Sequence, residues 1–275
     1  MTAARREQLL AYTVLGLFAI VALYPILSIL ALAFHERSDL VTGFAIPDRL
    51  SFGTFADAWE LGDFGRGLIN SFVVAGTVAL VTAVLSTLAG YAFGAMRFRG
   101  ADVLFYLLLL GLIFPYEATV IPLYYFFKDF GLTDTYWALI LPQIGLSVPF
   151  GTFWMRAFFR STPDSLVQAS RLDGASSFTT LWRVLLPQAR PALTTLVVLV
   201  FMWTWNEFLL ALVMIQSDEL RTAPLGLALF AGANRSQDPT LTAAAAVLVA
   251  LPIVVVYVFL QRSFIRGMFA GAVKE

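Results

Sequence analysis

Glu117 and Glu207 are the residues of this chain best placed to do chemistry, because each lies inside a long apolar stretch. An isolated charge at the centre of a bilayer costs about 2.5–3.5 kcal/mol on insertion scales, so both carboxyls are expected to face a bundle interior or an aqueous cavity. Two roles stay open. The slightly favoured one is a hydrogen bond between helices that fixes their packing, and the other is contact with a transported solute. The candidate translocation-path residues are Tyr116, Glu117, Trp203, Trp205, Asn206 and Glu207.

Other kinds of chemistry lack the residues they need. The 275 residues include one His and no Cys, which excludes thiolate metal sites, disulfides and a Cys nucleophile. His35 has no neighbour with which to share a metal ion, and we expect a solvated loop residue there and no metal site. No G-x-x-x-x-G-K-[ST] motif is present, so we expect no P-loop nucleotide site on this chain. We therefore expect a chain that binds no cofactor and is not an enzyme; an intramembrane enzyme is disfavoured.

The elements that must position these residues are membrane spans. Hydrophobic residues make up 59 % of the chain and charged residues 13 %, against about 25 % charged residues in soluble proteins. Net charge is zero and no basic stripe appears, which argues against nucleic acid as a partner. About 20 apolar residues cross a bilayer as a helix. The sequence thus predicts an all-α membrane protein with six transmembrane helices, over residues 9–34, 67–96, 103–127, 135–155, 191–217 and 239–261.

The charge distribution predicts the orientation of these spans. With the N-terminus in the cytoplasm, twelve of the 18 basic residues fall on the cytoplasmic side, against five acidic ones. The positive-inside rule favours this arrangement, with both termini cytoplasmic and the chain in the cytoplasmic membrane. The first apolar run is 26 residues long, whereas the apolar core of a signal peptide has about 7–15. We therefore interpret it as an uncleaved first helix.

The cytoplasmic segment 156–190 is more than a connection between spans. Thr162 is a candidate N-cap for a short helix, and Gly174 suits the left-handed residue that would end it. Ser176 or Ser177 can cap a second short helix, which Pro187 would stop or kink before the next span. Residue types alone leave two interpretations about equal: an amphipathic pair lying on the lipid, or a docking element for a cytoplasmic subunit.

The order of residues in this segment resembles the EAA motif of ABC importer permeases. In that motif Glu-Ala-Ala is followed after two residues by Asp-Gly-Ala, and after a spacer by Leu-Pro. Two departures are visible, Gln168 in place of Glu and Ser170 in place of Ala, and the first puts a salt bridge to an ATPase subunit in doubt. The resemblance implies a type I importer permease fold with a coupling helix at about 163–186. Its ATPase-docking residues would be Gln168, Ala169, Ser170, Leu172, Asp173, Gly174, Ala175, Leu186 and Pro187.

Further motifs extend the resemblance over nearly the whole chain. Asn70-Ser71, Trp205-Asn206-Glu207-Phe208 and the ending Gly271-Ala272-Val273-Lys274 are similar to the shorter permease of maltose-type, carbohydrate-uptake importers. The resemblance implies movement of a sugar or sugar-like solute by alternating access. The implied partners are a second homologous permease, two ATP-binding-cassette ATPase subunits that carry ATP and Mg, and an extracytoplasmic solute-binding protein. A permease for a polyol or glycerol phosphate, or an ATP-independent secondary transporter, stays as an alternative.

The resemblance also predicts three regions and two contacts. Residues 1–65 would be a first helix with an external loop, 66–262 a five-helix core, and 263–275 a cytoplasmic tail. The apolar stretch 222–232 is too short to span and is expected to be a loop or re-entrant segment. An external loop containing Pro224, Leu225, Gly226 and Asn234 would enter the cleft of the binding protein, or be a plain connector. The tail would contact the ATPase dimer as a flexible cationic strand through Arg266, Gly271 and Lys274, or be a disordered terminus.

Overall fold

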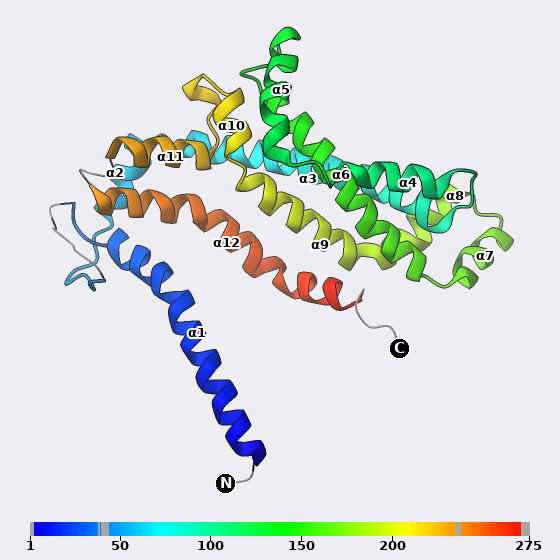
Figure 1. The fold of residues 1–275 in the computed structure, drawn as a ribbon, viewed down its shortest axis with the longest axis horizontal. Coiled ribbons are helices and arrows are strands. Elements are labelled where there is room, and N and C mark those ends of the chain that lie inside the picture. Colours follow the sequence, from blue (N-terminus) through cyan, green and yellow to red (C-terminus); the bar gives the residue numbers. More distant parts are fainter. Residues whose placement is uncertain (1–2, 38, 40–43, 235–237, 271–275) are drawn as a thin grey trace. The chain divides into compact units, whose positions relative to one another are not determined.

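The computed structural model describes residues 3–37, 39, 44–234 and 238–270, and all of the regular structure in that part of the chain is helical. It forms two compact units, one of residues 1–65 and 226–251 and one of residues 66–225 and 252–275. Figure 1 labels the helices. They are α1 (Ala3–Ala33), α2 (Gly53–Leu61), α3 (Phe64–Ala95), α4 (Ala101–Leu110), α5 (Tyr116–Asp129), α6 (Tyr136–Ser161), α7 (Asp164–Leu172), α8 (Ser177–Thr179), η1 (Thr180–Leu185), α9 (Leu186–Trp205), α10 (Leu209–Met214), η2 (Asp218–Leu220), α11 (Ala223–Asn234) and α12 (Pro239–Ala270).

In the first unit, the segment after α1 folds back onto its own helix. The Nδ1 of His35 lies 2.9 Å from the carbonyl oxygen of Ala31, and the hydroxyl of Thr54 in α2 donates to the carbonyl oxygen of His35 at 2.8 Å. His35 is buried as a result, with 6 % of its surface exposed. The expectation of a solvated loop residue was wrong, because hydrogen bonds tie His35 to the end of α1 and to α2, and the residue is buried.

An ion-pair cluster joins three parts of the first unit. The Nε of Arg37 lies 2.7 Å from Oδ2 of Asp238, and its Nη1 lies 3.2 Å from Oδ2 of Asp57 in α2. Asp238 also caps α12, because its Oδ1 accepts from the backbone N–H of Leu241 at 3.0 Å and from the hydroxyl of Thr240 at 2.8 Å. Burial by itself raises the pKa of Asp238, but these donors and Arg37 outweigh it, so that the pKa lies below its usual range.

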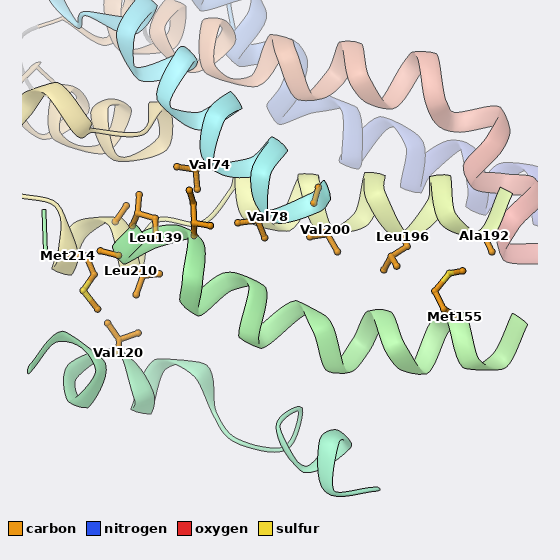
Figure 2. Packing of buried hydrophobic residues seen from close by; sticks show 14 of the residues in the cluster. Val74, Val78, Val120, Leu139, Met155, Ala192, Leu196, Val200, Leu210 and Met214 are labelled. Carbon is orange, nitrogen blue, oxygen red and sulfur yellow. The ribbon is translucent and has the colours of Figure 1, made fainter. Parts of the chain in front are cut away.

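The core of the second unit lies between α3, α5, α6, α9 and α10. Figure 2 shows buried side chains from all five helices meeting there, among them Val78, Val120, Leu139, Leu196 and Leu210. Small residues let α3 approach α6 closely: a Cβ added at Gly90 would lie 2.5 Å from the Cβ of Met155, and one at Gly94 would lie 2.9 Å from the Cβ of Phe159. Small residues four apart are a common way for membrane helices to pack.

The third predicted span is broken. Residues 103–127 form two helices, α4 and α5, and the segment 111–115 between them is not helical. Pro115 has extended backbone angles (φ −65°, ψ 117°) and stands before the first turn of α5. Its fixed φ and missing N–H make a helix start there easier than helix continuation. Five helices in the described residues are long and apolar enough to cross a membrane, rather than the six predicted.

The fifth predicted span also differs. The helix starts at Ser177 and continues to Trp205, with a π-helical turn at η1, and α10 follows after a break at 206–208. Pro187 lies in the first turn of α9 and neither stops nor separates the preceding helical segment. Residues 223–234 form the helix α11, so of the two alternatives for this stretch the loop was wrong and the re-entrant segment stays a prediction. The chain is helical to Ala270, so the expectation of a strand after residue 262 was also wrong.

Candidate functional site

The predicted docking loop is built around the end of α7. Gly174 has φ +76°, as the sequence predicted, and no atom lies within 4 Å of the position of a Cβ. The N–H of Ala175 donates to the carbonyl oxygen of Ser170, and the N–H of Gly174 donates to that of Arg171, both at 3.0 Å. This pair of bonds is a Schellman motif, which needs a left-handed residue after the helix. Backbone conformation, rather than a close neighbour, therefore requires glycine here.

The start of α7 differs from the prediction, whereas the start of α8 agrees with it. The hydroxyl of Thr162 donates to the carbonyl oxygen of Phe158 at 3.3 Å instead of capping α7, and the helix begins at Asp164 after Pro163. The Oγ of Ser176 accepts from the backbone N–H of Thr179 at 3.2 Å, which is the predicted N-cap. This bond ties Thr162, the residue after α6, to the last turn of that helix.

The loop presents an apolar tip to its surroundings. Leu172 is 89 % exposed, and Gln168, Ala169, Asp173, Gly174 and Pro187 are also exposed. Ser170 faces inward instead, where its hydroxyl lies 3.0 Å from the hydroxyl of Thr180, while Ala175 and Leu186 are half-buried.

The two helix breaks meet at Glu207. The hydroxyl of Tyr116 in α5 donates to Oε1 of Glu207 at 2.7 Å, which is the predicted hydrogen bond between helices. The same carboxylate accepts from the backbone N–H of Leu210 at 2.8 Å and from that of Ala211 at 3.2 Å. Glu207 therefore caps α10 and ties it to α5, and its charge lies at the partially positive end of a helix.

The other path candidates separate into exposed and buried side chains. Glu117 is exposed in the first turn of α5, so it does not face the interior of this chain. Asn206 and Trp203 are also exposed, and the Nδ2 of Asn206 donates to the carbonyl oxygen of Met202 at 2.8 Å. Trp205 is 2 % exposed, and its ring centre lies 4.9 Å from that of Phe72. Trp205 is a core residue, so it cannot line an open path in this structure.

A polar clamp that sequence reasoning missed holds the segment between α10 and α11. The Nδ2 of Asn70 donates to the carbonyl oxygens of Glu219 and Arg221, both at 2.8 Å, and its Oδ1 accepts from the hydroxyl of Tyr136 at 2.7 Å. The Oγ of Ser71 accepts from the N–H of Ala223 at 2.9 Å. The pair Asn70-Ser71 was visible in the sequence, but its partners are 66 to 152 residues away.

Asp134 fixes the other end of the same segment. Its Oδ1 accepts from the backbone N–H groups of Gln216 and Ser217, at 2.9 and 3.0 Å. The hydrogen bonds from Ser217 and then Gln216 hold the pKa of Asp134 below its usual range. Its own φ is +57°, a left-handed conformation that Asp tolerates better than most residues. The segment is therefore held in one conformation by side chains from α3, α6 and the α5–α6 connection.

The residues predicted for the binding-protein loop and for the tail differ in burial and in position. Leu225 is 2 % exposed within α11, so its side chain packs inside this chain. Pro224 and Gly226 are half-buried, and Asn234 is the last residue of the helix. Arg266 lies in α12, and Gly271 and Lys274 lie outside the described residues. Among the described residues, no group of three or more His, Asp or Glu side chains could hold a metal ion.

Comparison with known proteins identifies the family. Residues 86–270, which include both helix breaks and the docking loop, match the profile of the binding-protein-dependent transport system inner membrane component. The chain belongs to this family. It is an ABC importer permease, and its apolar helices are those of an inner-membrane component.

Two permeases with named sugar substrates are similar to this permease along most of its length. It is 34 % identical to the trehalose transport system permease protein SugB of Mycobacterium tuberculosis (strain CDC 1551 / Oshkosh), over 92 % of this chain and 93 % of that protein. It is 30 % identical to the melibiose/raffinose/stachyose import permease protein MelC of Bacillus subtilis (strain 168), over the full length of both.

A solved structure agrees with the fold of the permease. A chain of a bacterial ABC transporter involved in the import of the acidic polysaccharide alginate matches with a TM-score of 0.80 and 25 % identity, over 96 % of this chain and 99 % of that chain. A chain of the bacterial alginate ABC transporter, in complex with an alginate pentasaccharide-bound periplasmic protein, matches with a TM-score of 0.67 and 17 % identity. The type I permease fold that the sequence predicted is therefore confirmed.

Proposed function

We propose that this permease moves a carbohydrate across the cytoplasmic membrane, driven by two ATP-binding-cassette ATPase subunits and paired with a second homologous permease. The docking loop supports the proposal most directly, because a rigid Schellman turn presents Leu172 and its neighbours to a cytoplasmic partner. ATP hydrolysis belongs to the partners in this proposal, since the chain has no P-loop motif. A solute-binding protein outside the membrane would deliver the sugar.

The chemistry of the spans favours a neutral sugar. The six apolar stretches contain two residues of the charged types Asp, Glu, Lys and Arg, namely Glu117 and Glu207, and both are acidic. A uronate carboxylate would find no cation in these stretches, whereas neutral hydroxyls can donate to a carboxylate. The exposed Glu117, Asn206 and Trp203 lie next to the Tyr116–Glu207 hydrogen bond in the sequence, and we place the solute path beside them. Interrupted helices at membrane depth commonly line such a path.

Two further contacts belong to this proposal. We place the binding protein against the exposed side of α11, where Leu229 is 42 % exposed, rather than against the buried Leu225. The clamp at Asn70 and Ser71 supports this location, because it fixes the segment that leads into α11. We place the C-terminal tail, with Arg266, Gly271 and Lys274, against the ATPase dimer.

Substitution of Gly174 tests the proposal. Gly174→Asp puts a side chain on a left-handed residue at the docking turn, which strains the turn. In proteoliposomes that contain the whole complex and the binding protein, we expect sugar uptake to fall at least tenfold, with unchanged amounts of permease in the membrane. ATP hydrolysis should continue but lose its stimulation by the loaded binding protein.

Gly131→Asp is the matched control. Gly131 also has a positive φ, +65°, with no atom within 4 Å of a Cβ, but it follows α5 rather than α7. Its variant should transport sugar at close to the normal rate. Normal uptake by the Gly174 variant, or equal losses in both variants, would remove the docking assignment.

A further inference from the structure

A polar pocket lies beside the docking turn, between the end of α3 and α7. It has a volume of about 310 Å³ and is lined by Ala95, Arg97, Asp164, Val167, Gln168 and Arg171. The four lining residues on α7 are spaced by three or four residues, so they share one face of that helix. That face adjoins the exposed Ala169 and Leu172, and a molecule that covers the apolar tip also reaches the pocket.

The pocket carries an excess of positive charge. Two guanidinium groups, from Arg97 and Arg171, face one carboxylate, from Asp164. Throughout the described part of the chain, none of these three groups has an ion-pair partner within 4.0 Å, and none forms a side-chain hydrogen bond. The fourth polar residue is the neutral Gln168, at the position where the EAA motif usually has Glu. A glutamate here would balance the charges, and the amide leaves them unbalanced.

We propose that this pocket receives an acidic side chain of the ATPase subunit. The inference rests on the proposed function, in which that subunit covers the docking turn. Arginine binds carboxylates with two parallel hydrogen bonds, and such a pair gains strength when an interface excludes water from it. In this contact the permease supplies the cations and the ATPase supplies the carboxylate. The usual motif, with Glu at position 168, would place a carboxylate on the permease instead. A phosphate ion or a lipid headgroup would be attracted by the same charges, and the experiments separate these occupants.

Zero-length cross-linking identifies the occupant. Arg171→Lys and Arg97→Lys keep the positive charge and place a primary amine at the pocket, and a carbodiimide joins such an amine only to a carboxylate in direct contact. The natural chain has two lysines, Lys128 and Lys274, so the background can be measured in the unchanged complex. We expect an amide link from position 171 or 97 to an Asp or Glu of the ATPase, detected by mass spectrometry. Arg99→Lys is the control, since Arg99 is exposed near Arg97 but does not line the pocket.

A link from the pocket to Asp164 alone, or no link above the Arg99→Lys control, would overturn the proposal. A pocket that holds phosphate or a lipid headgroup gives one of these two results, because neither occupant offers a carboxylate from the ATPase.

Capture of the ATPase by tagged permease is the second measurement. The double variant Arg97→Glu/Arg171→Glu should recover at least tenfold less ATPase from detergent extracts than the unchanged permease, and Arg99→Glu should recover a normal amount. Gln168→Glu restores the usual residue of the motif, yet we expect it to lower recovery several-fold, because it cancels the excess charge. Unchanged or increased recovery with Gln168→Glu would contradict the inference. If the unchanged permease recovers no ATPase, the proposed function itself fails; if all variants recover it equally, only the pocket assignment fails.

Discussion

At the scale of single residues, Glu207 shows how a carboxylate is held in an apolar helix. Its two oxygens accept three hydrogen bonds, from the hydroxyl of Tyr116 and from two backbone N–H groups. The break at 206–208 exposes those N–H groups, and the carboxylate satisfies them. A single side chain therefore caps α10 and also links it to α5.

Removal of the Tyr116 hydroxyl should weaken this connection. Tyr116→Phe deletes the 2.7 Å hydrogen bond and leaves the capping bonds of Glu207 intact. Hydrogen bonds between membrane helices are worth about 1–2 kcal/mol in model systems, so we expect a lower midpoint of thermal unfolding for the purified complex. Tyr125→Phe, at an exposed position of the same helix, is the control and should leave the midpoint unchanged. Equal midpoints for both variants would mean that the bond adds nothing to stability.

Asp238 gives a prediction about pH. Its pKa is lower in the folded chain than the ordinary value of 3.8, so ionised Asp238 stabilises the start of α12 at pH values above 3.8. That contribution is lost as the pH falls below 3.8 through the folded pKa. Asp238→Asn should therefore speed hydrogen exchange of the α12 first turn at pH 7, and the difference from the unchanged chain should shrink below pH 3.8. Asp48→Asn, at an exposed position, should show no difference at either pH.

At the scale of elements, α3 and α6 depend on small residues, whereas the third and fifth spans depend on interruptions. Gly90 and Gly94 let two backbones approach, and Arg156 of α6 closes one end of this contact by donating from Nε to the carbonyl oxygen of Phe93 at 3.2 Å and pairing with Asp102 at 2.9 Å. The interrupted helices α4–α5 and α9–α10 instead meet through polar groups, because the hydroxyl of Tyr116 donates to the carboxylate of Glu207. Within the second unit, the uninterrupted helices α3 and α6 pack closely, whereas the interrupted helices provide the polar contact.

A larger side chain at the α3–α6 contact should separate the two helices. Gly90→Leu would overlap Met155 and the backbone of Arg156, and overpacking of a well-packed core costs about 1–3 kcal/mol. We expect less folded permease in the membrane and a lower unfolding midpoint. Gly76→Leu lies on the same helix with no atom within 4 Å of its Cβ, so it should be tolerated. Similar losses in both variants would point to a general effect of leucine in α3 rather than to the contact.

At the scale of the whole molecule, orientation in the membrane decides which surface each partner meets. The distribution of basic residues predicts that the docking turn and both termini lie in the cytoplasm, and that the segment held by Asn70 and Asp134 lies outside. The first helix, α1, has no buried residue in its most apolar part. Its exposed apolar surface suits contact with lipid or with a second subunit.

Cysteine labelling tests the orientation without background, because the chain has no cysteine of its own. Asp218→Cys, at a position with 79 % side-chain exposure, should react with a membrane-impermeant maleimide in intact cells. Arg99→Cys, also exposed, should react only after the membrane is permeabilised. The opposite pattern would reverse the orientation and place the docking turn outside.

The sequence by itself determined the features that depend on local composition. Long apolar runs predicted membrane helices, and the docking turn was predicted because a Schellman ending needs only Gly174 and the turn before it. Motif order within the docking segment was enough to indicate the family, which the comparison of residues 86–270 confirmed.

Only the tertiary structure decided the features whose partners are far apart in the sequence. Asn70 meets carbonyl groups about 150 residues away, the carbonyl oxygen of His35 accepts from Thr54 of α2, and the break before α10 is stabilised by Tyr116 from another helix. Apolar periodicity does not report such contacts, because a buried polar group looks the same in the sequence whether or not a partner satisfies it. The free energy of those hydrogen bonds depends on which distant groups the fold brings within about 3 Å.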